Sequence, residues 1–359
     1  DGTLRYRMLE SLREFAWEQL EAHGEVDAGR ARHARFFLSL AETAEPQLAG
    51  PNEALWHQRL EREHDNMRVG LEWTVDAEPE TALRYVGALR RFWNIRGHWT
   101  EGRDWVDRAL KNRTASPAIR AKALYSGAVL AQLLRDHATA ITRADECLTL
   151  RKSLDDKAGI AEALWYRGNL ARYTHDVPLA ISLYEQSLSI AKEAGDKPKV
   201  AAALHGLGRT AQKAKDFARA REWLREALLI SRQTGEFQAT ISALLGLGEI
   251  ALDEGDLDDA EKAFAEVLSH AREHGDKYNT AEGLEHLAYT ADQRGDLLKA
   301  NVLLGDALSL YKELDDESSA GAILRRMGQI ADRAGDTKRA ALLIEQSLVL
   351  NRRLRQLGG

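Results

Sequence analysis

The chain has 359 residues, of which 44% are hydrophobic and 30% are charged, and its formal net charge is −6. That charge disfavours a surface dedicated to nucleic acid, because phosphate binding needs a concentrated basic patch. No apolar run reaches the ~20 residues that a membrane-spanning helix requires. The single cysteine, Cys147, excludes a disulfide framework, and we expect it to be a small core residue. We therefore expect a helix-rich, cytoplasmic protein without nucleic-acid or membrane contacts.

Residues 1–24 change their pattern part of the way along. Apolar residues at positions 4, 6 and 8 alternate with arginines, which predicts a short strand. From Ser11 onward the apolar spacing becomes helical. Because the chain opens on Asp1 rather than Met, we interpret this segment as the end of a truncated domain followed by a linking helix.

Residues 25–111 are expected to form a helical adaptor. Gly97-His98 is the expected turn of a degenerate first repeat, and the polar, Pro-ended segment at 112–117 predicts a short linker. The apolar spacing indicates four helices, over residues 25–48, 51–77, 79–96 and 99–111.

Residues 117–357 repeat one unit six times at a period of 40 residues. The marker is an aspartate followed four residues later by an alanine, and no insertion or deletion interrupts the count. A period in this range is typical of solenoids. The six pairs are Asp136/Ala140, Asp176/Ala180, Asp216/Ala220, Asp256/Ala260, Asp296/Ala300 and Asp336/Ala340.

The unit at 241–276 predicts two helices joined by a tight turn. Apolar and small residues recur at helical spacing in each half. Gly255 can take the left-handed C-terminal cap without steric cost, and Asp256 is suited to capping the next helix. Gly248 and Ala260 are small where the two helices are expected to cross.

This large–small pattern resembles that of tetratricopeptide (TPR) repeats. The usual TPR unit has about 34 residues, so a period of 40 implies longer helices, and the family's end-of-helix proline is missing. The resemblance implies an all-α fold, a TPR-like α-solenoid in which six helix-turn-helix repeats over 117–357 form a right-handed superhelix. In one repeat the pattern is carried by Leu164, Gly168, Ala171, Ala180 and Tyr184.

A second resemblance covers roughly residues 1–110. Three stretches are similar to the last winged-helix strand and the following helices of bacterial STAND-class signalling ATPases: positions 5–16, positions 32–37 and positions 60–68. In those proteins a nucleotide-binding module and a winged helix precede a C-terminal TPR sensor, often with a SARP-type or LuxR-type DNA-binding domain at one end. The resemblance implies that this chain is a regulator arm, with 1–24 ending a winged-helix domain.

No catalytic or cofactor motif is found in the sequence. The G-x-x-x-x-G-K-[ST] loop is absent, so any nucleotide hydrolysis by a parent protein would lie upstream of Asp1. His270 and His274 are four residues apart and His286 is the nearest third histidine, but the HEXXH order is missing and a solvated helix end is favoured. We expect no enzyme activity, no cofactor and no bound metal.

The remaining candidate is the groove that the first helix of each TPR unit lines. Carried over from the family, the exposed row beside the packed stripe is aromatic and basic in the middle repeats and acidic in the next two. Trp165 beside Asn169 and Arg172 has the make-up of a binding hot spot, although packing of Trp165 and Tyr173 between neighbouring repeats is an equally open interpretation. The candidate binding residues are Tyr125, Trp165, Asn169, Arg172, Tyr173, His205, Arg209, Lys213, Glu249, Glu285 and Tyr289.

The functional hypothesis is a ligand- or protein-binding TPR sensor of a bacterial signal-transducing transcriptional regulator. Its expected partners are a protein or peptide, or a small-molecule effector, and an upstream nucleotide-binding and winged-helix module of the same parent chain. The alternative is a constitutive TPR scaffold that binds a protein or peptide without switching. An RNA-binding helical repeat is disfavoured by the net charge.

Overall fold

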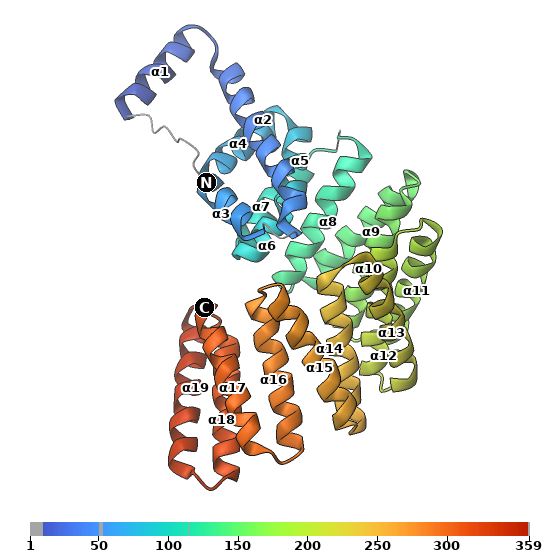
Figure 1. The fold of residues 1–359 in the computed structure, drawn as a ribbon. Coiled ribbons are helices and arrows are strands. Elements are labelled where there is room, and N and C mark those ends of the chain that lie inside the picture. The colour runs from blue at the N-terminus through green and yellow to red at the C-terminus, as the bar shows by residue number, and fades with distance from the viewer. Residues whose placement is uncertain (1–9, 50–52, 114, 358–359) are drawn as a thin grey trace. The chain divides into compact units, whose positions relative to one another are not determined.

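The computed structural model of the protein describes residues 10–49, 53–113 and 115–357. Within these residues the chain forms nineteen α-helices, one 3-10 helix and no strand (Figure 1). The all-α, TPR-like solenoid predicted from the repeats is confirmed. The short strand expected at positions 4, 6 and 8 lies outside the described residues. The helices fall into two compact units, Asp1–Thr174 and His175–Gly359, and the domain boundaries expected after residues 24 and 111 remain predictions.

The first unit begins with a group of helices that partly departs from the expected pattern. The expectation of single helices over 51–77 and 79–96 is wrong, because the first breaks at Glu63 and the second at Leu89. No proline or glycine flanks Glu63, so the apolar period alone could not indicate the break. These elements are α1 (Glu10–Ala22), α2 (Val26–Ala44), the 3-10 helix η1 (Glu45–Ala49), α3 (Glu53–Arg62), α4 (His64–Ala77), α5 (Pro79–Ala88), α6 (Arg90–Arg96) and α7 (Trp99–Leu110).

Large, fully buried side chains form the core of these helices. Trp93, Phe92 and Tyr85 have no exposed surface. The Tyr85 hydroxyl donates a hydrogen bond to the backbone carbonyl of Ala34 at 2.5 Å, which ties α5 to α2. Gly70 on α4 makes room for this ring, because a Cβ at that position would lie 2.6 Å from the hydroxyl oxygen. The packing of α2, α4 and α5 therefore depends on one aromatic side chain and one glycine.

The repeats are pairs of helices of nearly equal length. The first five helices of the array all have 17 residues. Successive helices begin half a repeat period apart, so each repeat is one pair, as expected. The longer helices account for the difference from the usual ~34-residue TPR unit. The first unit contains α8 (Pro117–Leu133), α9 (His137–Ser153) and α10 (Lys157–Tyr173); the second contains α11 (Val177–Glu193), α12 (Lys197–Lys213), α13 (Phe217–Thr234), α14 (Phe237–Glu254), α15 (Leu257–Glu273), α16 (Lys277–Gln293), α17 (Leu297–Glu313), α18 (Glu317–Arg333) and α19 (Thr337–Leu357).

Every turn between these helices uses the same backbone arrangement. A residue at positive φ precedes the acidic residue at the N-terminus of the next helix, and the pattern recurs twice in each repeat. At Gly255, as predicted, φ is +79°, and the Asp256 side chain accepts a hydrogen bond from the backbone N–H of Asp259 at 3.1 Å. Glu236 is the exception, since its side chain makes no capping bond. The capping aspartates are Asp136, Asp156, Asp176, Asp196, Asp216, Asp256, Asp276, Asp296, Asp316 and Asp336.

Small residues let the paired helices approach closely, as the sequence predicts. A Cβ on Gly248 would lie 2.5 Å from the ring of Phe264, and a Cβ on Gly208 would lie 2.6 Å from Cγ of Leu224. In both repeats a large side chain from the second helix therefore fills the space above a glycine of the first helix. A crossing packed in this way has no room for a larger residue.

Gly208→Leu should lower the free energy of unfolding by roughly 1–3 kcal/mol, because overpacking a filled crossing displaces its neighbours. The matched control is Gly305→Ala on α17, where no neighbouring atom lies within 4 Å of the added Cβ. That change should leave stability unchanged or raise it, because alanine is the better helix former. Denaturant titration measures both variants, and equal unfolding free energies would contradict the tight crossing.

Lys215→Gly should raise the free energy of unfolding by roughly 0.5–1 kcal/mol. Lys215 has φ of +61°, and glycine takes this left-handed conformation without the steric penalty of a Cβ. The reverse change, Gly255→Ala, should lower the free energy of unfolding by a similar amount. The same titration tests both, and a loss of stability in Lys215→Gly would show that the lysine side chain makes a stronger compensating contact.

Candidate functional site

All eleven candidate residues lie on the first helices of the repeats. We define the first-helix face as the side chains of α8, α10, α12, α14, α16 and α18 that flank the packed stripe. α8 and α10 belong to the first compact unit, and the other four helices belong to the second. The contacts below are therefore those within each unit.

In the first unit, two of the predicted aromatic residues are wholly or partly buried. Tyr125 is 9% exposed. Its ring centroid lies 5.2 Å from that of Tyr166, and the guanidinium carbon of Arg90 lies 5.1 Å from it. Trp165 is half-buried and packs against the core cluster that contains Tyr125. Tyr125 therefore contributes to packing between α8 and α10 and presents little surface to a ligand.

The end of α10 is closer to solvent. Tyr173 is 55% exposed, and the guanidinium carbon of Arg172 lies 4.9 Å from its ring centroid, a cation–π arrangement. Asn169, one turn earlier, is half-buried. The structure thus places Arg172 and Tyr173 side by side, with more than half of the tyrosine exposed.

In the second unit, the basic and acidic repeats are joined by a polar network. Arg209 on α12 donates to Oε2 of Glu249 on α14 at 2.5 Å and to Oε1 of Gln212 at 3.0 Å, and Gln212 also donates to Glu249 at 3.2 Å. The side chains of Arg209 and Glu249 are 31% and 28% exposed. Their positions differ by 40, one repeat period. That period could have indicated the pairing, which our sequence analysis missed.

The other two candidates of α12 have separate surroundings. Nζ of Lys213 lies 2.9 Å from Nδ1 of His175, and His175 lies in the turn before α11. His205 is half-buried. Lys213 is therefore engaged with the turn before α11, and the structure does not gather it with Arg209 and Glu249 into one site.

A second network joins α16 to α18. Nη1 of Arg326 lies 3.7 Å from Oε1 of Glu285, and the Arg326 guanidinium carbon lies 4.8 Å from the ring centroid of Tyr289. The Tyr311 hydroxyl also donates to Glu285 at 3.4 Å. One arginine from the following repeat therefore holds two of the predicted residues, although Arg326 itself is absent from the predicted set.

Glu282 on α16 adjoins both networks and was also missed. It is half-buried, and no described residue donates a hydrogen bond to it. Burial raises the pKa of Glu282, and the carboxylates of Glu249 and Glu285 raise it further, against the opposing effect of Arg209. A partly buried acid with a raised pKa is a recognised mark of functional sites. Glu282 is therefore a candidate position on this face for a cationic or hydrogen-bond-donating group.

The histidines weighed as metal ligands are not brought together. His286 stacks on Phe264, with ring centroids 4.5 Å apart, and burial lowers its pKa. His274 stacks on Phe237 at 4.1 Å. His270 instead lies beside a carboxylate on its own helix. Each ring therefore has its own packing or ionic contact.

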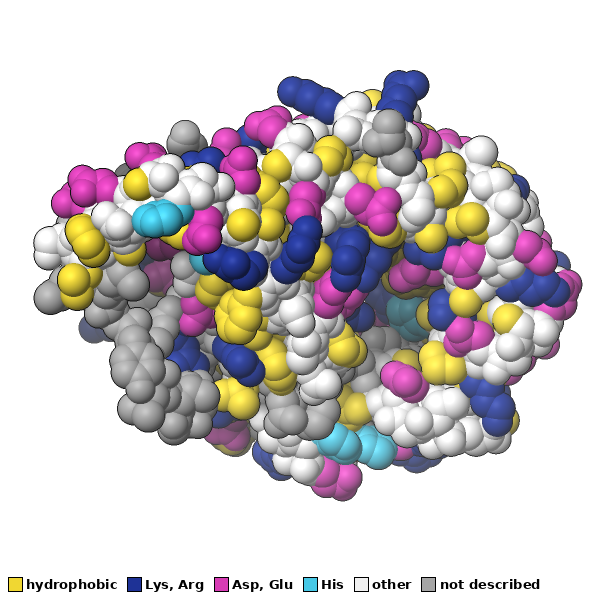
Figure 2. All heavy atoms as spheres, turned by 90° about the horizontal axis from the view of Figure 1, so that it is seen from above, with side chains coloured by type: hydrophobic (Ala, Val, Ile, Leu, Met, Phe, Trp, Pro, Cys, Tyr) yellow, Lys and Arg dark blue, Asp and Glu magenta, His cyan; other side chains and the backbone are white. Residues whose placement is uncertain are grey.

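The surface carries charges of both signs. Figure 2 shows Lys and Arg side chains close to Asp and Glu side chains over much of the face in view. Within the described residues, no helix combines the length and apolar character that crossing a membrane requires.

Comparison with known proteins identifies the repeats. A family model for the tetratricopeptide repeat matches residues 159–233 and 239–313. The chain therefore contains TPR repeats, a fold that serves as a protein-interaction scaffold. The resemblance to TPR arrays that the sequence predicts is confirmed.

Two curated relatives are transcriptional regulators by name. They are the "Putative HTH-type transcriptional regulator Rv0890c" of Mycobacterium tuberculosis and the "Putative HTH-type transcriptional regulator Mb0914c" of Mycobacterium bovis. Each is 30% identical over 172 residues, which are 45% of this chain and 19% of the relative. The match thus spans about a fifth of the length of these relatives.

Solved structures share the fold. A signal transduction ATPase with numerous domains (STAND) and a TPR sensor, from Pyrococcus horikoshii, has a TM-score of 0.61 at 11% identity, covering 90% of this chain and 52% of that one. The apo form of RapI has a TM-score of 0.60 at 12% identity, covering 76% and 99%. A Rap protein complexed with Competence and Sporulation Factor has a TM-score of 0.53 at 15% identity, covering 89% and 99%. At such identities the similarity concerns the fold alone.

Glu282→Gln should raise the melting temperature at neutral pH. An acid whose pKa is raised by folding binds its proton more tightly in the folded state, so the wild type loses stability as pH rises from the ordinary value of 4.5 through the raised one. The glutamine variant lacks this loss, and its advantage should fade as pH falls toward 4.5. Thermal melting across this range measures it, with Glu222→Gln, exposed on α13, as control. Parallel profiles of melting temperature against pH for the wild type and Glu282→Gln would contradict a raised pKa of Glu282 in the folded protein.

Proposed function

We propose that this chain is the partner-binding TPR sensor of a bacterial signal-transducing transcriptional regulator. The TPR repeats support the binding role, because this fold is a protein-interaction scaffold. The similarity to the mycobacterial regulators supports the regulatory context. In this proposal the nucleotide-binding and winged-helix module of the parent protein precedes the chain, and segment 1–24 ends that module.

The observation that carries the binding proposal is the unpaired carboxylate of Glu282 on the first-helix face. It lies among Glu249 and Glu285 and is only partly solvated, so it attracts a group that brings positive charge. Tyr289, which lies beside the guanidinium of Arg326, is about two helical turns further along α16. The ligand class that fits is a protein segment or peptide with a lysine, an arginine or a free amino terminus near an apolar side chain.

A ligand at this position would act on contacts between repeats. The Arg209–Glu249 and Arg326–Glu285 pairs each join one repeat to the next. A cation placed at Glu282 competes with both arginines for the same carboxylates, and thereby changes how neighbouring repeats are held. The repeats would then have two arrangements, one with these ion pairs intact and one with the ligand in their place. Signalling follows only if the ligand binds one arrangement more tightly than the other, because a ligand with equal affinity for both does not shift their equilibrium.

The test is a pull-down from lysate with the wild type, with a Glu282→Lys/Tyr289→Ala double variant and with Leu298→Ala as the matched control. Leu298 is 84% exposed on α17, a second helix of the same unit. We expect mass spectrometry to find a partner that the wild type and the control retain and the double variant loses. Retention of every partner by the double variant would contradict binding at the first-helix face of the second unit.

A further inference from the structure

Three histidines of the first unit surround the ring of Phe92. His57 lies on α3, His64 begins α4 and His98 precedes α7. Their ring centroids are 6.4, 5.0 and 5.5 Å from that of Phe92, and the rings of His64 and His98 are 4.5 Å apart. The three residues belong to separate segments, so no spacing in the sequence indicated the cluster.

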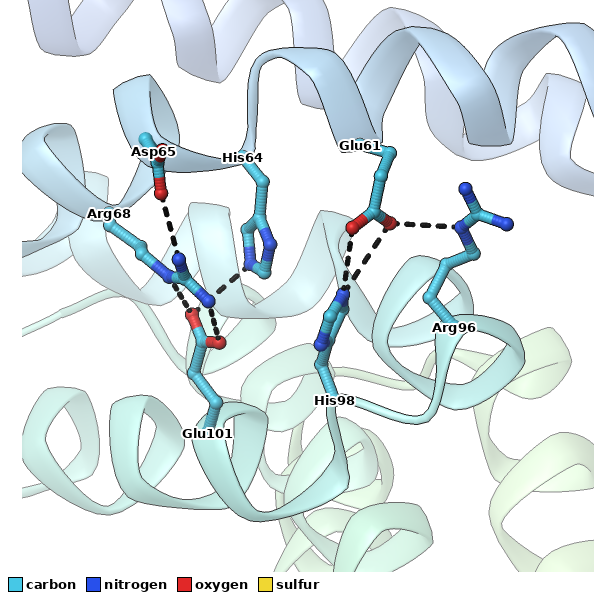
Figure 3. Close-up of polar contacts among 7 residues, drawn as sticks. All are labelled: Glu61, His64, Asp65, Arg68, Arg96, His98 and Glu101. Atoms are coloured by element: carbon cyan, nitrogen blue, oxygen red, sulfur yellow. Dashed lines mark hydrogen bonds and ion pairs between the residues drawn. The ribbon is translucent and has the colours of Figure 1, made fainter.

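Glu61, at the end of α3, faces His98. Both of its carboxylate oxygens lie 3.4 Å from Nε2 of His98. Nε of Arg96 donates to Oε2 of Glu61 at 2.9 Å, which fixes one oxygen and leaves Oε1 for another partner. Figure 3 shows Glu61 and His98 pointing toward each other, with Arg96 on the outer side of the carboxylate.

Glu101, on α7, approaches His64 from the other side. Its Oε1 lies 3.1 Å from Nε2 of His64. Arg68 donates to both of its oxygens, at 2.8 and 2.6 Å. In Figure 3 Arg68 and Arg96 flank the cluster on opposite sides. Each carboxylate is thus oriented by its own arginine while its other side meets a histidine.

Some of these imidazole nitrogens lack hydrogen-bond partners. His57 and His64 are each 5% exposed. Among the described residues, neither nitrogen of His57 has a hydrogen-bond partner, and Nε2 of His64 meets only Oε1 of Glu101, at 3.1 Å. Buried polar groups without a partner are rare in native proteins and point to a bound ion, a water or a functional role.

We propose that Glu61, His64 and His98 bind a divalent transition-metal ion, and Zn²⁺ in particular. One potential ligand atom from each of the three lies within 4.8 Å of the other two. Two imidazole nitrogens and one carboxylate oxygen are the donors of three-ligand zinc sites, which keep a fourth position open. Magnesium and calcium favour oxygen ligands, so this donor set discriminates against them.

Small side-chain rotations would close the site. In a tetrahedral zinc centre, bonds of about 2.0–2.2 Å place neighbouring ligand atoms roughly 3.3–3.6 Å apart. Both carboxylate oxygens of Glu61 already lie 3.4 Å from Nε2 of His98, whereas the three ligand atoms together lie only within 4.8 Å of one another. Glu61 and His98 can move, because their side chains are 37% and 26% exposed. Buried His64 is held by Glu101, and a carboxylate behind the imidazole is the usual partner of a metal-ligating histidine.

The ion would connect three helices, since Glu61 ends α3, His64 begins α4 and His98 caps the start of α7. It would add a cross-link to the Arg96–Glu61 and Arg68–Glu101 contacts that already join these segments. Zinc should therefore stabilise the first unit, because an ion that binds only the folded state shifts unfolding by mass action.

Isothermal titration of the untagged, chelator-treated chain with ZnCl₂ tests the proposal. We expect about one equivalent to bind with a Kd below ~10 µM, a rise in melting temperature, and no heat with MgCl₂. Co²⁺ in place of Zn²⁺ should give the visible absorption of a low-symmetry, four-coordinate ion. His98→Gln and Glu61→Gln, both at partly exposed positions, should weaken Zn²⁺ binding at least tenfold.

His23→Gln is the matched control, because His23 is exposed in the same unit and lies outside the cluster. It should bind Zn²⁺ as the wild type does. The melting curve of each metal-free variant shows whether it folds, so a variant that folds but does not bind supports the site. Absence of Zn²⁺ binding in the wild type, or wild-type affinity in both His98→Gln and Glu61→Gln, would overturn the proposal.

Discussion

The structure depends on one turn, repeated at a fixed spacing of half a repeat. A residue at positive φ ends each helix of the array, and the next residue, an aspartate in all but one turn, caps the following helix through its side chain. Each cap contributes roughly 0.5–2 kcal/mol, and their equal spacing matters more than any single one. Because helices of nearly equal length begin at the same phase, Gly208, Gly248 and Gly328 each meet a large residue of the partner helix, namely Leu224, Phe264 and Ile344.

The same spacing creates the candidate binding face. Equivalent positions on successive first helices are separated by one repeat period, which brings Arg209 to Glu249 and Glu285 to Arg326. These charged side chains are therefore partly exposed and also pair with one another across neighbouring repeats. At Glu282 this network supplies no hydrogen-bond donor, so the carboxylate of Glu282 is left unpaired among the described residues. Holding a partly buried carboxylate unpaired costs stability.

The sequence was sufficient for the array because its signals are local and periodic: Gly255, Asp256 and the small residues at helix crossings act within one repeat. It was insufficient where the outcome depends on contacts across segments. Glu63 breaks a helix without any proline or glycine, and Tyr125 is covered by Arg90 and Tyr166 from other helices. The pairs around Arg209 and Arg326 could have been found by aligning the repeats. The histidines around Phe92 could not, because three segments without a common period bring them together.

Site-specific photo-crosslinking can show whether a partner binds the first-helix face of the second unit. A benzophenone amino acid would replace Tyr289 on α16 in one protein and Leu298 on α17 in another, the latter being 84% exposed on a second helix. After irradiation in cells, our account predicts a discrete cross-linked partner from position 289 and none from position 298. A cross-link from 298 with none from 289 would contradict it and place binding on the second helices.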